Sequence, residues 1–382
     1  MEKEKKKSKI GSTIFMIFFM IIGGICGAFG MKVAMNNSTS LEECIIWIFG
    51  IMIILYLSIF VQIIVHESGH LIFGLISGYE FVSFRVGSFM FFKKEGKLQI
   101  KRFSLMGTAG QCLMAPPKPY NENMPFVLYN LGGIIANIIV SIISIILFFV
   151  MKDYKVLSIL FLFMAILGTF FAITNGLPIH FGPVDNDGSN TLNISKNERA
   201  KWSFWLQLEI NARISKGLRL KDMPDEWFEI PSNEDMKNSL CNTMAVLAFN
   251  RAIDDENFQL AREISEELMK NSNNLVPIYK YILTFERIYL ELIGDNSKEK
   301  IDAMFTAEVK KVGKSLKKYP SFIRIMYAYE LLYNNDEKAA EMQYKAFEKF
   351  ARKYPYNSEM QGERELMGYA KNVYIKKKEQ LS

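Results

Sequence analysis

Long apolar runs fill the first half of this 382-residue chain, and charged positions become frequent in the second half. From Ile10 to Ile179 the sequence is mostly Ile, Leu, Phe, Met and Val, and from about Asn190 onward Lys and Glu recur. This change of pattern predicts a membrane-embedded part followed by a soluble tail. The length is enough for roughly two to three domains.

Four apolar runs are long enough to cross a bilayer, which takes about 20 helical residues. They are Ile10 to about Met35, Ile45 to about Gly78, Phe126–Met151 and Val156 to about Ile173. A secretory signal peptide is the alternative interpretation of the first run. The basic residues before this run fit either a signal peptide or an uncleaved membrane helix. The first run is longer than a usual signal-peptide core, and no small-residue cleavage site follows it, which favours an uncleaved helix.

Basic residues are distributed unevenly among the connecting loops. Five lysines precede Ile10, the first loop (NNSTSLEE) has no Lys or Arg, and the second loop, Tyr79–Pro125, has seven. Because Lys and Arg near membrane helices stay on the cytoplasmic side, the pattern predicts a multi-pass cell-membrane protein with both termini cytoplasmic. These loops also account for the net charge of +6, which therefore does not indicate nucleic acid.

Two regions outside the apolar runs have patterns of their own. Residues 81–103 carry aromatic and β-branched residues on both sides of KKEGK, which predicts a membrane-associated β-hairpin turning at Lys94 to Gly96. Ser104–Pro125 is rich in Gly and Pro and is either a connector or part of the site. A hairpin edge could bind an extended substrate by strand addition, or the hairpin simply packs on the membrane surface.

The tail has apolar residues at helical intervals, for example Phe258, Ala261, Ile264 and Leu268. Segments beginning at Asp254, Gly294 and Asn334 resemble one another at a spacing of about 40 residues, which is longer than the 34 of a tetratricopeptide repeat. The pattern predicts a tetratricopeptide-like helical domain. Such a domain presents a concave surface to a protein partner, or it only stabilises the membrane part.

The predicted fold class is therefore mainly α: a polytopic membrane protein with about four transmembrane helices, a small β-hairpin and a soluble α-helical repeat domain. The predicted divisions are residues 1–40 for the first transmembrane helix, 41–190 for the membrane core and 191–382 for the cytoplasmic helical domain. The four cysteines are scattered without a CxxC pair, which argues against a disulfide framework and against a cysteine zinc site.

The second apolar run contains HESGH, with His66, Glu67 and His70. On a helix the two imidazoles lie one turn apart on the same face. Two histidines at this spacing bind zinc, and the glutamate between them can take a proton from a zinc-bound water. Ionisable residues inside a bilayer are costly and therefore tend to be functional. The alternatives are a polar cluster between helices and a metal site that has been lost.

A catalytic zinc site needs a third protein ligand. The segment after the fourth run, Asn175–Asn190, contains His180, Asp185 and Asp187 among several Gly and Pro residues. Non-helical backbone at membrane depth persists only where protein buries it or where it lines a water-filled cavity. On the residues alone, this segment is either the wall of such a cavity or an ordinary exit turn with solvated aspartates.

HESGH in a membrane helix, then LGGIIAN ending at Asn137, then NGLP beginning at Asn175 and followed by Asp187-Gly188, resembles the site-2 protease family. These zinc metalloproteases cut peptide bonds within the membrane. The resemblance covers roughly residues 45 to 190 of this chain, and the three motifs occur in the family's order. The departures are extra residues between NGLP and Asp187-Gly188 and the lack of the family's frequent PDZ insert.

The resemblance implies that His66, His70 and Asp187 bind Zn²⁺ and that Glu67 is the catalytic base. It implies substrate contacts for Asn175 and Asn137, although a membrane asparagine can also serve only helix packing. Asp187 is preferred to Asp185 because a glycine follows it, and His180 is a weaker candidate ligand.

The implied activity is an intramembrane zinc metalloendopeptidase acting on membrane-embedded or membrane-docked peptides. Cleavage of this kind releases anchored regulators or processes signal and precursor peptides. The alternatives are a zinc protease that recruits Glu80 as its third ligand, and a non-catalytic membrane scaffold or peptide-binding protein with a structural or lost metal site.

Overall fold

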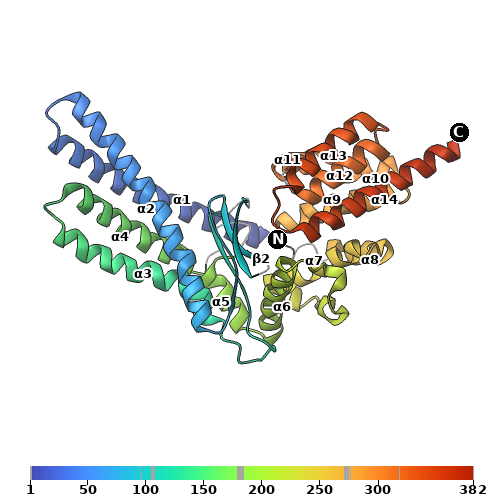
Figure 1. Cartoon of the computed structure of the whole chain (residues 1–382), viewed down its shortest axis with the longest axis horizontal. Helices are drawn as coiled ribbons and strands as arrows, with labels where there is room; N and C mark the ends of the chain where they lie inside the picture. Colours follow the sequence, from blue (N-terminus) through green and yellow to red (C-terminus); the bar gives the residue numbers. More distant parts are fainter. Residues whose placement is uncertain are drawn as a thin grey trace. The chain divides into compact units, whose positions relative to one another are not determined.

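The computed structural model describes residues 2–94, 96–104, 108–178, 185–270, 275, 277–317 and 319–381 (Figure 1). The chain is mainly helical and divides into two compact units. The first unit comprises residues 1–100 and 104–198, and the second comprises residues 101–103 and 199–382.

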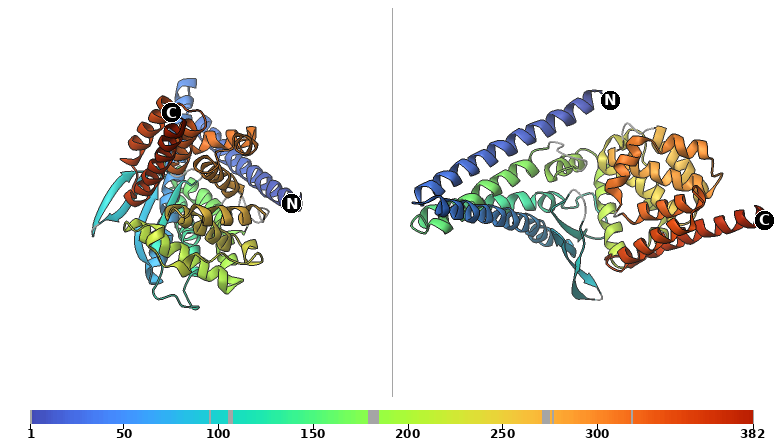
Figure 2. Two further views of the ribbon diagram at one scale, coloured as in Figure 1. Left: turned by 90° about the vertical axis from the view of Figure 1, so that its right-hand side faces the viewer. Right: turned by 90° about the horizontal axis from the view of Figure 1, so that it is seen from above.

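The first unit contains the four long apolar helices that the sequence predicts. They are α1 (Glu2–Asn36), α2 (Leu41–Ile76), α3 (Val127–Val150) and α4 (Lys155–Gly176). By length and composition, all four can cross a membrane, α1 through its segment Phe19–Asn36. Helices α2, α3 and α4 lie side by side, as the right-hand view of Figure 2 shows.

Burial in these helices is the reverse of burial in a soluble protein. Ile46 and Ile53 of α2 and Ile146 of α3 are exposed, whereas Gln62 of α2 and Asn137 of α3 are completely buried. Exposed apolar side chains are favourable in lipid, and buried polar groups that find partners there satisfy their hydrogen bonds inside the bundle. This distribution supports the assignment of the bundle to a membrane.

The ends of α2 are set by local residues. Ser40 caps the first turn by accepting a hydrogen bond from the Glu43 amide. Gly78 follows the last turn with a φ of +83°, a conformation that glycine adopts without steric cost. The chain then turns directly into the first strand.

The β-structure is larger than the predicted hairpin. Four strands form one sheet in the order β3-β2-β1-β4. Their bounds are β1 (Glu80–Val86), β2 (Phe89–Lys94), β3 (Lys97–Arg102) and β4 (Gly110–Ala115). β1 pairs antiparallel with β2 on one side and with β4 on the other. β4 lies in the stretch considered a connector or part of the site, and its partner is distant in sequence, so local turn signals could not reveal it.

A short helix, α5 (Asp187–Ser195), completes the first unit. It follows the segment 179–184, which is outside the described residues and includes the candidate ligand His180. Helix α5 packs against α3 and α4.

The second unit is helical from α6 onward. Its longer helices are α6 (Glu198–Ser215), α7 (Ser239–Asp254), α8 (Phe258–Lys270), α9 (Pro277–Ile293), α10 (Lys298–Met304), α11 (Ala307–Leu316), α12 (Pro320–Leu332), α13 (Glu337–Ala351) and α14 (Asn357–Leu381). Three single-turn 3₁₀ segments are η1 (Leu220–Asp222), η2 (Asp225–Phe228) and η3 (Asp235–Lys237).

One turn geometry recurs in this unit. Glu256, Asn296 and Asn335 have φ values of 55°, 55° and 54°, and each connects a longer helix to the next. They lie about 40 residues apart, at the spacing of the three similar sequence segments. Only the geometry of these three turns recurs, so the tetratricopeptide-like repeat domain stays a prediction.

Candidate metal centre

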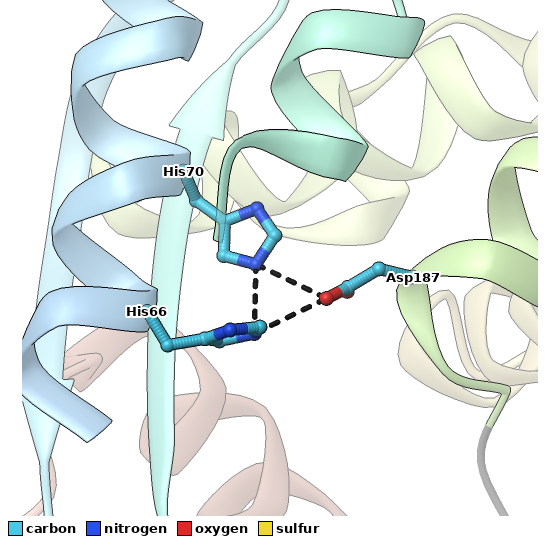
Figure 3. A group of neighbouring side chains, drawn as sticks. All are labelled: His66, His70 and Asp187. Atoms are coloured by element: carbon cyan, nitrogen blue, oxygen red, sulfur yellow. Dashed lines mark hydrogen bonds and ion pairs between the residues drawn. The ribbon is translucent and has the colours of Figure 1, made fainter. Parts of the chain in front are cut away.

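Helix α2 presents His66, Glu67 and His70 toward the interior of the first unit. His70 and Glu67 are buried and His66 is half-buried. The two imidazole rings lie edge to face with their centroids 4.8 Å apart, as the helical spacing of four residues predicts. Figure 3 shows both rings directed at the carboxylate of Asp187, which comes from the start of α5.

Three ligand-type atoms converge at this point. Asp187 Oδ2 lies 3.1 Å from His66 Nε2 and 3.4 Å from His70 Nε2, and the two nitrogens are 3.2 Å apart. With zinc–ligand bonds of about 2.0–2.2 Å, ligand atoms at the corners of a tetrahedron are about 3.3–3.6 Å apart. The triangle therefore has nearly the size that a tetrahedral ion requires.

The outer nitrogen of each histidine shows where its proton lies. His70 Nδ1 is 2.8 Å from the carbonyl oxygen of Tyr129, which only accepts hydrogen bonds. His66 Nδ1 is 2.7 Å from Asn137 Oδ1, which is also an acceptor. Both Nδ1 atoms must therefore donate, so in the neutral rings both Nε2 atoms carry lone pairs toward Asp187. Three lone-pair donors facing one another call for a cation.

Buried amides fix the ring of His66. Asn137 Nδ2 donates to the side-chain oxygen of Gln62 at 2.7 Å, which leaves Asn137 Oδ1 for the imidazole. Gln62 Nε2 in turn donates to the Met164 carbonyl of α4 at 2.6 Å. This chain links α2, α3 and α4 behind the histidine, in the manner of the outer hydrogen bonds that orient metal-binding imidazoles.

Asp187 is placed by the residues on either side of it. Asn186 caps α5 by accepting from the Ser189 amide, and its side-chain nitrogen donates to the carbonyls of Thr174 and Leu177 at the end of α4. A Cβ on Gly188 would come within 2.1 Å of the Gly176 carbonyl oxygen. Only glycine permits this approach of α5 to α4, which explains the Asp-Gly pair physically.

A glycine on α3 makes room for the histidines. A Cβ at Gly133 would lie 2.6 Å from His66 Cε1 and 2.7 Å from His70 Nε2. Any side chain there would push the rings away from Asp187. The Gly-rich stretch before Asn137 thus provides space for the ligands in addition to close helix packing.

Other sequence candidates lie elsewhere. Asp185 is outside the group of three and accepts a hydrogen bond from Asn193. Glu80 is exposed at the start of β1 and is also outside the group. Asn175 donates to the Phe171 carbonyl of its own helix, a local contact that leaves its predicted role toward substrate untested. For Asn137 the geometry favours orientation of His66 over contact with a substrate, because its amide is buried and occupied.

Sequence reasoning missed Gln62 and Asn186. Gln62 gave a usable signal, because it is an amide in an apolar run one helical turn before His66. Asn186 gave none, since its role depends on how α5 meets α4. The described residues thus bring His66, His70 and Asp187 into a group that can hold a metal ion. No family model, no curated protein and no solved structure matches this chain.

Proposed function

We propose that this protein is an intramembrane zinc metalloendopeptidase of the site-2 protease type. The observation that carries the proposal is the convergence of His66 Nε2, His70 Nε2 and Asp187 Oδ2, with Glu67 on the same helix. Three protein ligands leave a fourth tetrahedral position open, which is the arrangement of catalytic zinc sites, whereas structural sites are closed by four protein ligands.

The residues divide the chemistry among them. A zinc ion in this site would act as a Lewis acid and lower the pKa of a bound water to about 7. His66, His70 and Asp187 would hold the ion, and Asn137 and the Tyr129 carbonyl would keep both imidazoles in the ligating tautomer. Glu67 would accept the proton of the attacking water and return it to the leaving amine.

The proposed substrates are peptides that lie in the membrane or dock onto it. The site is built from α2, a helix that can cross a membrane, and from the start of α5, which packs against α4, another such helix. We infer further that both termini and the helical domain are cytoplasmic, because the basic loops favour that side. The helical domain would then meet its protein partners in the cytoplasm.

The direct test is mass spectrometry of membrane peptides from cells producing the wild type, Glu67→Gln or Glu80→Gln. Glu67→Gln keeps the shape of the side chain and removes the base, so cleavage should fall by about 10²–10⁴-fold while zinc stays bound. Glu80→Gln changes an exposed glutamate close by in sequence and should leave the peptides unchanged. Identical peptides in all three samples, with zinc bound, would instead favour a non-catalytic peptide-binding protein.

A further inference from the structure

Among the described residues of the first unit, Arg85 of β1 is the largest fully buried side chain, with 1% of its surface exposed. Its Nη1 donates to the Gly87 carbonyl at 2.9 Å, and its Nη2 donates to the Thr108 hydroxyl and, at 3.1 Å, to the Gly110 carbonyl. These acceptors flank the β1–β4 pairing at the end where β4 begins. The guanidinium therefore holds the start of β4 at several points.

This arrangement is unusual for a buried cation. Among the described residues no carboxylate forms an ion pair with Arg85, although burying an unpaired charge is costly. Backbone carbonyls and one hydroxyl take its hydrogen bonds instead. Burial lowers the pKa of the Arg85 guanidinium, and the nearby charge of Glu67 acts in the opposite direction. The charge that opposes the effect of burial is that of the glutamate of the HESGH motif.

The segment that Arg85 holds lies directly against Glu67. A Cβ added to Gly110 would come within 2.4 Å of Glu67 Oε1 and within 2.6 Å of its Cγ. The backbone of Gly110 is thus in contact with the carboxylate and limits the rotamers open to it. The carbonyl of the same residue accepts the hydrogen bond from Arg85 Nη2.

We propose that Arg85 is a positioning residue for Glu67: it fixes Gly110 and the start of β4 against the carboxylate and thereby holds this base toward the ligand triangle. The inference rests on the proposed function. Among the described residues, Arg85 forms no hydrogen bond with His66, His70 or Asp187, so its effect on the site passes through Gly110 and through its charge. A base displaced by about 1 Å can lose about 10²-fold in rate, which makes such a support worthwhile.

The test compares Arg85→Gln, Arg85→Lys and Thr108→Val with the control Lys97→Gln, which removes an exposed cation from the same sheet. Full-length protein in detergent is assayed on a synthetic peptide spanning the bond identified by the Glu67→Gln comparison. Arg85→Gln should lower kcat by about 10–100-fold with KM within about threefold and zinc content unchanged. Arg85→Lys should have an intermediate kcat, because it keeps the positive charge but loses the several N–H donors of the planar guanidinium. Lys97→Gln should have the kcat of the wild type.

A second readout does not depend on catalysis. Cys112 is a buried residue of β4, so its alkylation rate, resolved by peptide mass spectrometry, reports on release of this strand. Arg85→Gln should raise that rate about tenfold and Thr108→Val by less, while Cys241 in the second unit serves as the internal reference. A merely structural role would raise alkylation and KM together and would leave Arg85→Lys no better than Arg85→Gln.

The outcomes separate the two proposals. If wild type and Glu67→Gln produce the same peptides, the proposed protease activity fails, whatever the Arg85 variants do. If the wild type cleaves and zinc-loaded Arg85→Gln retains wild-type kcat, the positioning role of Arg85 is overturned and the protease activity stands. If Arg85→Gln loses zinc, the test uses Arg85→Lys and Thr108→Val instead. An unchanged kcat in both of these variants would also reject the positioning role of Arg85.

Discussion

Each unit of this protein buries a cluster of polar groups, and the two clusters differ in how their charges are matched. In the second unit, called the helical unit below, Arg324 Nη2 donates to both oxygens of Glu286 at 2.7 Å and Arg324 Nε donates to one oxygen of Glu363 at 2.6 Å. In the first unit, Asp187 faces the Nε2 atoms of two imidazoles whose Nδ1 atoms lie against acceptors, so in the neutral rings no proton lies between the three ligand-type atoms. The first cluster contains its own cation and the second does not.

This difference shows how a buried structural network can be told from a binding site. A buried ion pair is tolerated when hydrogen bonds satisfy both partners, and removal of one partner is then strongly destabilising. A set of lone pairs without a proton or cation among them is unfavourable until a cation arrives, which is the arrangement expected of a site that can bind a metal ion. The following experiments test this contrast, in order of expected effect.

The largest expected effect is on the ligand triangle itself. Asp187→Asn should lower zinc affinity by about 10³-fold or more. The substitution removes the only charged ligand of the three, and the three ligands together would supply a binding free energy of about 10–16 kcal/mol. The matched variant Asp185→Asn, two residues away and outside the triangle, should bind zinc as the wild type does. Metal analysis after dialysis against a chelator measures both, and equal loss in the two variants would contradict the assignment of Asp187.

The next effect is expected at Arg324. Arg324→Met should destabilise the helical unit by about 3–5 kcal/mol, because Glu286 and Glu363 remain buried without their partner. Zinc content should not change, since the substitution removes a structural cation in the other unit. Urea unfolding followed by tryptophan fluorescence measures the cost, with Lys237→Met in an exposed ion pair expected to cost less than about 1 kcal/mol. A smaller cost at Arg324 than at Lys237 would refute the contrast.

The pH dependence of the helical unit should come partly from Glu359. Burial and the charges of Glu363 and Asp254 raise the pKa of this carboxyl to about 7, against the hydrogen bond from Tyr354. Because the pKa of Glu359 is higher in the folded state than in the unfolded state, its contribution to the free energy of unfolding is fully present below the unfolded pKa. This contribution is lost as the pH rises toward 7. The loss amounts to roughly 3 kcal/mol.

Glu359→Gln should therefore stabilise the protein at pH 8 by about 2–3 kcal/mol and change little at pH 5. Trp202, Trp205 and Trp227 all lie in the second unit, so their fluorescence reports its unfolding in urea at each pH. The exposed Glu341→Gln serves as the control and should stay within about 0.5 kcal/mol at both pH values. Equal effects of Glu359→Gln at pH 5 and pH 8 would show that its carboxyl titrates normally.

The smallest effect is expected for Asn137, whose side chain contacts the outer nitrogen of His66. Asn137→Leu should lower zinc affinity by about 10–100-fold, because it removes the acceptor that fixes the ligating tautomer. Asn175→Ala loses only a contact within its own helix, so zinc affinity should hold while the KM for peptide rises if Asn175 contacts substrate. The comparison fails if the two variants lose zinc to the same extent.

The features of this protein that its sequence predicts are those set by local physics. The four helices that can cross a membrane follow from the length of the apolar runs, because transfer into lipid depends on composition along one segment. The spacing of His66 and His70 needed only helix geometry. The strand β4 was not predicted as a strand, because its partner β1 is distant in the chain and because β4 lies in the Gly- and Pro-rich stretch Ser104–Pro125.

The sequence by itself therefore determined the segments that can cross a membrane, the paired histidines with their glutamate, and two aspartates as candidate third ligands. Tertiary structure brought Asp187, and not Asp185, to the two histidines, because Gly188 and Asn186 let the start of α5 approach the end of α4. It also decided that Asn137 orients His66 and that Arg85 lies behind Gly110. These outcomes depend on distances between helices and strands that are far apart in the chain, which no local pattern of residues encodes.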